Sequence, residues 1–402
     1  MTTTPAVART VKAFLQQALP PLIATGGPGA SRVILFSASI LFFSADLTAA
    51  FGGDFFLLML LNTAFAQSFG FFLLKPDFQG NHRSIYRQSL QGLALSGLLC
   101  VALWAFGLLF SLGYSLVILV LLHLYYVLRY RFIALHRFGP LALAELLISL
   151  ACLLGPWWVS QAATTVNQHD LYLIYALALA LGLAVLLLSH QRLPAASSSN
   201  GLRPSLREVR NIAVSTTGGI FAVFILPAAI KQIAAAEIVS VVALAVSCIS
   251  ISILLPRTYG NTILTQLANP ATRAEQLRSI GTRYQALVVA GVVVAYVLTL
   301  AYLAVMGIAV MEIWWLPLMI ALLILAAQSS FVKLTYLSLQ NEDGYVARLN
   351  LLTLLGNAAY IGIALYAVGT TFALMIALAA AVVNFVLRNF FAQRYAQRVL
   401  AH

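Results

Sequence analysis

The chain has 402 residues, of which 62% are hydrophobic and 8% charged, and its mean hydropathy is +0.95. Water-soluble domains do not have this composition, so the sequence predicts an all-α membrane protein that crosses the bilayer many times. The net charge is +12, and the basic residues lie in short segments between apolar stretches. This placement argues against nucleic-acid binding and indicates the orientation of the chain in the membrane instead.

Apolar windows of about 20 residues predict twelve transmembrane helices, six on each side of a polar connector. Their expected limits are 19–45, 53–74, 87–111, 114–135, 140–160, 169–190, 208–232, 236–256, 283–306, 313–335, 346–367 and 370–390. The connector at 194–206 separates an N-terminal six-helix lobe, 1–193, from a C-terminal one, 207–402. Because six is even, both lobes have the same orientation, and we expect two parallel repeats.

Three short similarities between the halves support a duplication. Their offsets grow slowly along the chain, from 190 to 195 to 205 residues. The paired segments are 26–29 with 216–219, 83–85 with 278–280, and 136–139 with 341–344. Three matches in the same order predict a six-helix unit that is present twice.

The charged residues between spans predict the orientation of the chain. With the N-terminus inside, the inner segments carry most of the cations, among them Arg9, Lys12, Lys75, Arg129, Arg131, Arg137, Arg192, Lys333 and Arg388. The outer connections carry Asp46, Asp54, Asp170, Glu237, Glu312 and a single cation, Lys231. Both termini are therefore expected in the cytoplasm. The N-terminus lacks a signal-peptide pattern, so we expect the first span to be retained.

The first span carries one arginine near its middle. Arg32 precedes Asp46, at the outer end, by 14 residues, which corresponds to about 21 Å along a helix. A charge in the hydrocarbon costs about 2.5–3.5 kcal/mol on insertion scales and usually faces protein or a wet cavity. A guanidinium suits bidentate binding of phosphate, so Arg32 is a candidate anion site. The alternative is a packing role at the near interface or at the carbonyls of another helix.

Glycine clusters occur at the same place in both halves and are candidate hinges. In span one the cluster comprises Gly26, Gly27, Pro28 and Gly29, and in span seven Gly218 and Gly219. Proline removes a backbone hydrogen bond and weakens the helix locally. We expect both spans to bend there.

Other polar residues are candidates for substrate contact. The set comprises Arg83, Arg87 and Arg278 at the cytoplasmic ends of spans three and nine, Gln67 in span two, and Thr216 and Thr217 in span seven. The arginines would attract an anionic group, and the neutral groups would form hydrogen bonds with a polar substrate. Ordinary positive-inside residues and interhelical hydrogen bonds are the alternative explanations.

Two titratable residues inside spans are candidates for coupling. Glu145 lies about six residues into span five, and His123 lies in span four beside Tyr125 and Tyr126. Either would bind and release protons, or Glu145 sodium, during transport. The alternatives are an ion pair of Glu145 with Arg32 or another arginine, and a hydrogen-bonded packing histidine.

Several segments together resemble the multidrug/oligosaccharidyl-lipid/polysaccharide (MOP) exporter superfamily, in particular its Wzx-like O-antigen flippases. Ser31-Arg32-Val33 is similar to the opening of the first helix of the lipid II flippase. Residues 44–71 resemble the family's outer turn and second helix, and residues 234–256 the matching elements of the second half. The split into six plus six spans with both ends inside is also similar.

The resemblance implies V-shaped, MATE-like lobes around a cavity that opens to one face at a time. It implies that the cargo is an undecaprenyl-pyrophosphate-linked oligosaccharide, moved from the inner to the outer leaflet for surface polysaccharide assembly, such as lipopolysaccharide. Only Arg32 matches a motif position closely enough to inherit a role at the pyrophosphate. A polysaccharide polymerase and chain-length proteins are the expected partners, besides membrane lipid.

Two other functions remain open at this point. A drug or small-molecule antiporter would need a buried carboxylate, for which Glu145 is the candidate. A glycan polymerase or acyltransferase would need a large outer loop with Arg or His, and the segment 156–169 offers only His169. The sequence lacks catalytic, metal-site and phosphate-loop motifs, so neither an enzyme activity nor a cofactor is expected.

Overall fold

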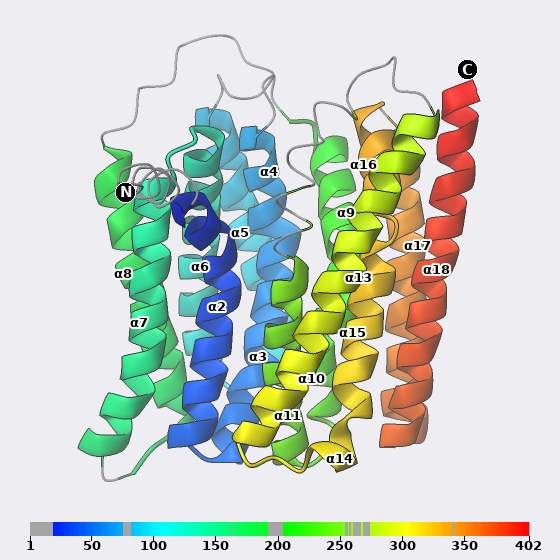
Figure 1. Cartoon of the computed structure of the whole chain (residues 1–402). Coiled ribbons are helices and arrows are strands. Elements are labelled where there is room, and N and C mark those ends of the chain that lie inside the picture. Colours follow the sequence, from blue (N-terminus) through cyan, green and yellow to red (C-terminus); the bar gives the residue numbers. More distant parts are fainter. Residues whose placement is uncertain are drawn as a thin grey trace, which may run out of the picture. The chain divides into compact units, whose positions relative to one another are not determined.

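The computed structural model describes residues 19–74, 82–163, 165–191, 204–253, 256, 259, 267, 274–340 and 342–401. All regular secondary structure in these residues is helical (Figure 1). Most of the predicted linker at 194–206, together with Arg9, Lys12 and Lys75, lies outside the described residues. The described helices form two compact units, which are residues 1–44 with 65–204, and residues 45–64 with 205–402.

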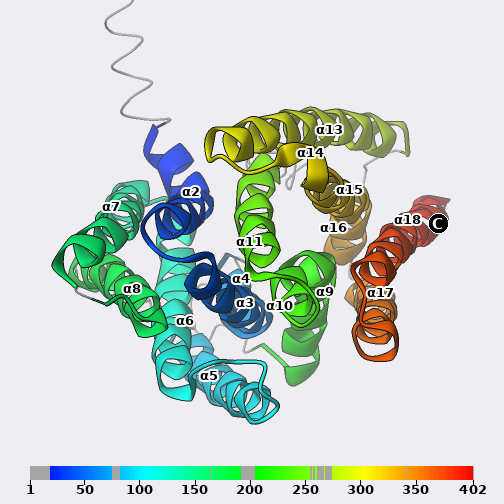
Figure 2. The ribbon, with the colours of Figure 1, turned by 90° about the horizontal axis from the view of Figure 1, so that it is seen from below.

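The first unit contains the helix of span one, the end of span two and the helices of spans three to six. Its elements are α2 (Leu19–Phe42), α4 (Ser68–Leu74), α5 (His82–Ala105), α6 (Leu112–Ala134), α7 (Phe138–Ala162) and α8 (Gln168–His190). Helix α2 packs along α7, which packs on α8 (Figure 2). Large side chains such as Phe36, Tyr125 and Tyr172 fill the interior, while Leu98 and Leu188 are each 67% exposed, as expected for a surface that lipid covers.

The second unit contains the remaining helices. These are α3 (Ala45–Asn62), α9 (Leu206–Phe224), α10 (Leu226–Ile230), α11 (Ala236–Ser250), α13 (Ala274–Val305), α14 (Val310–Ile313), α15 (Trp315–Gln328), α16 (Phe331–Leu339), α17 (Asp343–Ile363) and α18 (Thr371–Ala401). The 3₁₀ turn η3 (Ile251–Ile253) extends α11, and the π-helix η4 (Ala364–Val368) extends α17. Helix α17 packs against both α9 and α18.

Helix α3 packs with α9, α10 and α11, although it precedes the linker in the chain. Lys231 Nζ lies 3.3 Å from the fully buried Asp54 carboxylate, and Ser240 Oγ donates to the Ala45 carbonyl at 2.9 Å. The π-helix η1 (Thr63–Gln67) joins α3 to α4, and the division between the two units falls within it. The second span is therefore shared between the units.

Each of the twelve predicted spans coincides with helical segments in the described residues, which confirms the predicted fold class. Ten of these segments are long and apolar enough to cross a membrane. The other two are α2 and α9, the first helices of the two halves, which are not among these ten. Both carry the glycine clusters and the threonines or arginine that the sequence marks as functional candidates.

Candidate functional site

Helix α2 continues through its glycine–proline cluster, so the helix is not interrupted at the predicted hinge. Pro28 lies inside the helix, and it has no N–H to donate to the carbonyl four residues earlier. That carbonyl belongs to Ala24. An unpaired carbonyl in a membrane interior costs several kcal/mol, so another group has to donate to it.

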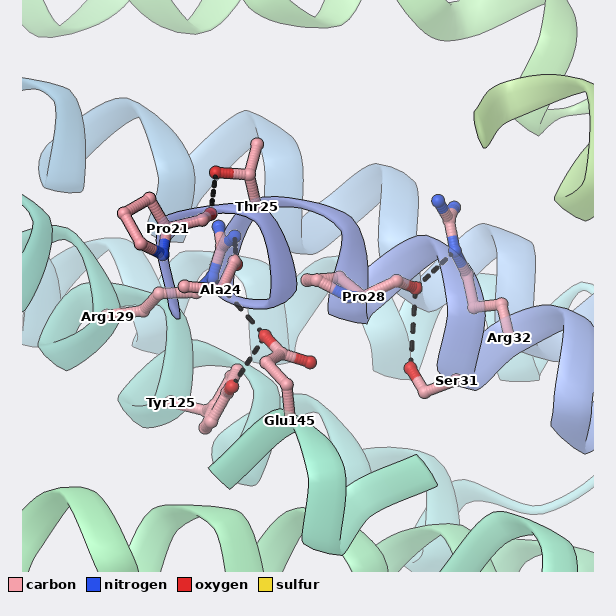
Figure 3. A network of polar contacts seen from close by, with 9 residues as sticks. All are labelled: Pro21, Ala24, Thr25, Pro28, Ser31, Arg32, Tyr125, Arg129 and Glu145. Atoms are coloured by element: carbon pink, nitrogen blue, oxygen red, sulfur yellow. Dashed lines mark hydrogen bonds and ion pairs between the residues drawn. The ribbon is translucent and has the colours of Figure 1, made fainter. Parts of the chain in front are cut away.

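Arg129 of α6 supplies the missing donor. Its Nη2 lies 2.6 Å from the Ala24 carbonyl oxygen, and the residue is 9% exposed. Figure 3 shows the guanidinium between Ala24 and the carboxylate of Glu145. A side chain from a neighbouring helix thus replaces the hydrogen bond that Pro28 removes, and it fixes α2 to α6 at this point.

Glu145 of α7 balances the charge of Arg129. Its Oε1 lies 3.4 Å from Arg129 Nε and accepts a hydrogen bond of 2.7 Å from the Tyr125 hydroxyl. The carboxylate is 1% exposed. A Cβ added at Gly27 would overlap the Glu145 side chain, so Gly27 allows α2 and α7 to approach closely. Pro28, Gly27, Arg129 and Glu145 therefore form one polar centre in the first unit.

Arg32 lies one turn of α2 beyond this centre. Its Nε donates to the Pro28 carbonyl at 2.9 Å, and the side chain is half-buried. In Figure 3 the guanidinium points away from Glu145, which pairs with Arg129 instead. The structure thus places Arg32 and Glu145 near each other in the first unit but does not join them in an ion pair.

The other predicted arginines lie at the beginnings of their helices. Arg87 is exposed on α5 and Arg278 is exposed on α13. Arg83 is in the first turn of α5, but its side chain lies outside the described residues.

The remaining predicted residues lie in η1, α6 and α9. Thr216 Oγ1 donates to the Ile212 carbonyl of its own helix at 2.9 Å, and the neighbouring Thr217 hydroxyl is buried without a hydrogen-bond partner among the described residues. Gln67 lies in η1 and is partly buried. His123 is 1% exposed in α6 and contacts the backbone of Ser89 in α5.

Sequence reasoning missed Arg129, which it assigned to an inner connection. This arginine lies within the predicted span 114–135, and helix α6 buries it. The signal was present in Pro28, because a proline inside a transmembrane helix requires a donor for the carbonyl four residues earlier. Among the described residues, no group of three His, Cys, Asp or Glu side chains is placed to hold a metal ion.

The fold is that of known transporters. The chain superposes on an inward-facing multidrug resistance MATE family transporter of the MOP superfamily with a TM-score of 0.63 and 12% identity, covering 94% of this chain and 95% of that one. A MATE structure in the bent conformation gives a TM-score of 0.53 at 12% identity, covering 96% of both chains. A eukaryotic MATE transporter gives 0.53 at 14% identity, covering 98% of this chain and 99% of that one.

Similarity in sequence is far weaker than similarity in fold. No protein-family model matches the chain, and no curated protein matches it in sequence. The fold therefore defines a multi-pass membrane protein with the MATE architecture.

Proposed function

We propose that the chain is a flippase of the MOP superfamily that moves an undecaprenyl-pyrophosphate-linked oligosaccharide across a bacterial inner membrane. The observation that carries this proposal is the half-buried guanidinium of Arg32, which is held to α2 through its Nε. Fixing Nε orients the guanidinium, and the planar group suits bidentate binding of a diphosphate. The MATE-like fold supports transport by alternating access.

In this proposal both termini lie in the cytoplasm, and the exposed Arg87 and Arg278 attract the anionic headgroup at the inner side. Gln67, Thr216 and Thr217 contact the sugars, and the glycine clusters of α2 and α9 are the hinges. A polysaccharide polymerase and chain-length proteins receive the product. The protein itself makes and breaks no covalent bond.

A drug antiporter is the second candidate, because the superposed structures include a multidrug resistance transporter and Glu145 is a buried carboxylate. Proton coupling at Glu145 would suit either cargo. As a binding site for a cationic drug, however, Glu145 is already occupied by Arg129 at 3.4 Å. This contact favours the flippase over the antiporter.

The experiment compares Arg32→Met and Arg32→Lys in cells that depend on the chain for their surface glycan. We expect Arg32→Met to abolish export and Arg32→Lys to retain a part of it, because lysine keeps the charge and loses the bidentate geometry. Arg137→Met, which removes an exposed arginine that has no role in this proposal, is the matched control and should export nearly normally. Full export by Arg32→Met would refute the anion site, and drug resistance that requires Glu145 would favour the antiporter.

A further inference from the structure

The second unit contains a polar centre at the place that corresponds to Glu145 in the first. Glu145 is the eighth residue of α7, which begins at Phe138, and Asn350 is the eighth residue of α17, which begins at Asp343. A Cβ added at Gly27 would overlap Glu145, and a Cβ added at Gly218 of α9 would lie 2.7 Å from the Asn350 carbonyl oxygen. Each half thus packs a glycine of its first helix on this residue of its fifth helix.

A buried arginine contacts this residue in both units. Arg388 of α18 is 3% exposed, and its Nη1 donates to the Asn350 side-chain oxygen at 2.9 Å. Its Nη2 donates to the Ala327 carbonyl at 2.5 Å. Ala327 lies in the last turn of α15, where carbonyls lack partners within the helix. Like Arg129, Arg388 therefore repairs an interrupted helix.

The two centres differ in charge. In the first unit the Glu145 carboxylate neutralises Arg129. In the second unit the corresponding residue is a neutral asparagine, and neither of the two ion pairs among the described residues includes Arg388. The α15 carboxyl end and the Phe385 ring, whose centroid is 4.7 Å from the guanidinium carbon, contribute only partial negative charge.

One donor of Arg388 is also unused. Its Nε is buried and has no hydrogen-bond partner among the described residues. A buried charge without a counter-charge is costly, and so is a buried donor without an acceptor. A single anion bound at Nε would remove both costs at once.

We infer that Arg388 and Asn350 form a binding site for a small inorganic anion of the chloride class within the second unit. The anion accepts from Nε and supplies the negative charge that Glu145 supplies in the first unit. The near-complete burial of Arg388 favours a monatomic ion over a bulky organic anion. This site is independent of the cargo, because Arg32 belongs to the other unit.

The test measures the thermal unfolding midpoint of the purified full-length protein in detergent, in sodium chloride and in equimolar sodium gluconate at one pH. We expect the wild type to unfold at a higher temperature in chloride, because a ligand that binds only the folded state stabilises it. In Asn350→Asp the chain provides its own counter-charge. This variant should lose the chloride-dependent shift and be at least as stable as the wild type in gluconate.

Asn357→Asp is the matched control. Asn357 is also fully buried on α17, but its side-chain oxygen accepts from Asn384 and not from Arg388, so this variant should keep the chloride-dependent shift. Arg388→Gln removes the cation and should lose the shift, which decides the matter if Asn350→Asp does not fold. A wild type with equal midpoints in both salts would overturn the inference, and so would a full shift in Asn350→Asp or Arg388→Gln.

Discussion

At the scale of single residues, the Arg129–Glu145 pair allows a quantitative prediction. Removing one partner leaves the other as an uncompensated buried charge, which costs about 3–5 kcal/mol, whereas removing both is often nearly neutral. We therefore expect Arg129→Met to lower the unfolding free energy by about 3 kcal/mol or more. The double variant Arg129→Met, Glu145→Gln should regain most of this loss. Thermal unfolding of the purified variants measures both.

The double variant will not regain all of the loss, because the Ala24 carbonyl loses its donor. Arg87→Met serves as the control for removing an arginine from an exposed position. The pairing would be contradicted if the double variant lost as much unfolding free energy as Arg129→Met and Glu145→Gln lose together as single variants.

The sequence indicated which polar residues lie within the spans, but it did not indicate which residues they contact. Arg388 was assigned to the cytoplasmic tail with its neighbours, yet α18 extends to Ala401 and buries it. Arg129 and Arg388 lie within the limits predicted for their spans, 114–135 and 370–390, near the inner ends. There a count of inner charges does not distinguish a buried arginine from an exposed one, which is why the pattern of charges alone did not reveal their contacts.

At the scale of helices, two adjacent glycines of α9 should respond in opposite ways to the same substitution. Gly218→Ala places a methyl group 2.7 Å from the Asn350 carbonyl oxygen, so α9 and α17 must separate. Overpacking of this kind costs about 1–3 kcal/mol. At Gly219 a Cβ meets nothing within 4 Å, and alanine should stabilise the helix by about 0.5–1 kcal/mol.

The unfolding midpoints of the two variants decide this prediction, and each variant is the control of the other. If both alanine variants lower the unfolding midpoint by the same amount, the two glycines act through the flexibility of α9 and not through its contact with α17. The sequence predicted this glycine pair as a hinge, and the close approach of α17 to Gly218 is a second role that no spacing rule reveals.

At the scale of the whole molecule, the twelve predicted spans followed from hydropathy, because each span buries apolar side chains over about 20 residues. The predicted duplication followed from three short similarities between the halves. Hydropathy contains no information on which helices contact each other. It could not reveal that residues 45–64 pack with 205–402. It also placed Asp54 and Lys231 in separate outer connections, whereas the two form an ion pair between α3 and the end of α10.

We predict that this ion pair holds the first half of the second span to the second unit. With Cys100, Cys152 and Cys248 replaced, Ser240→Cys reports on the contact, because Ser240 is 3% exposed and bonds to Ala45. In this background Asp54→Asn should speed labelling by a membrane-impermeant maleimide about fivefold or more, as expected for a coupling of about 1 kcal/mol. Lys231→Arg keeps the charge and should label slowly. Equal labelling rates in Asp54→Asn and in its parent would show that the ion pair does not hold the second span in place.

The sharing of the second span also constrains how the protein is made. The ribosome releases residues 45–64 well before it synthesises their partners in α9 to α11, which end at Ser250. At about 5–20 residues per second this delay is roughly ten to forty seconds. During that time Asp54 has no lysine to neutralise it. The newly made helix must therefore remain in contact with the insertion machinery or with a chaperone until the second half is synthesised.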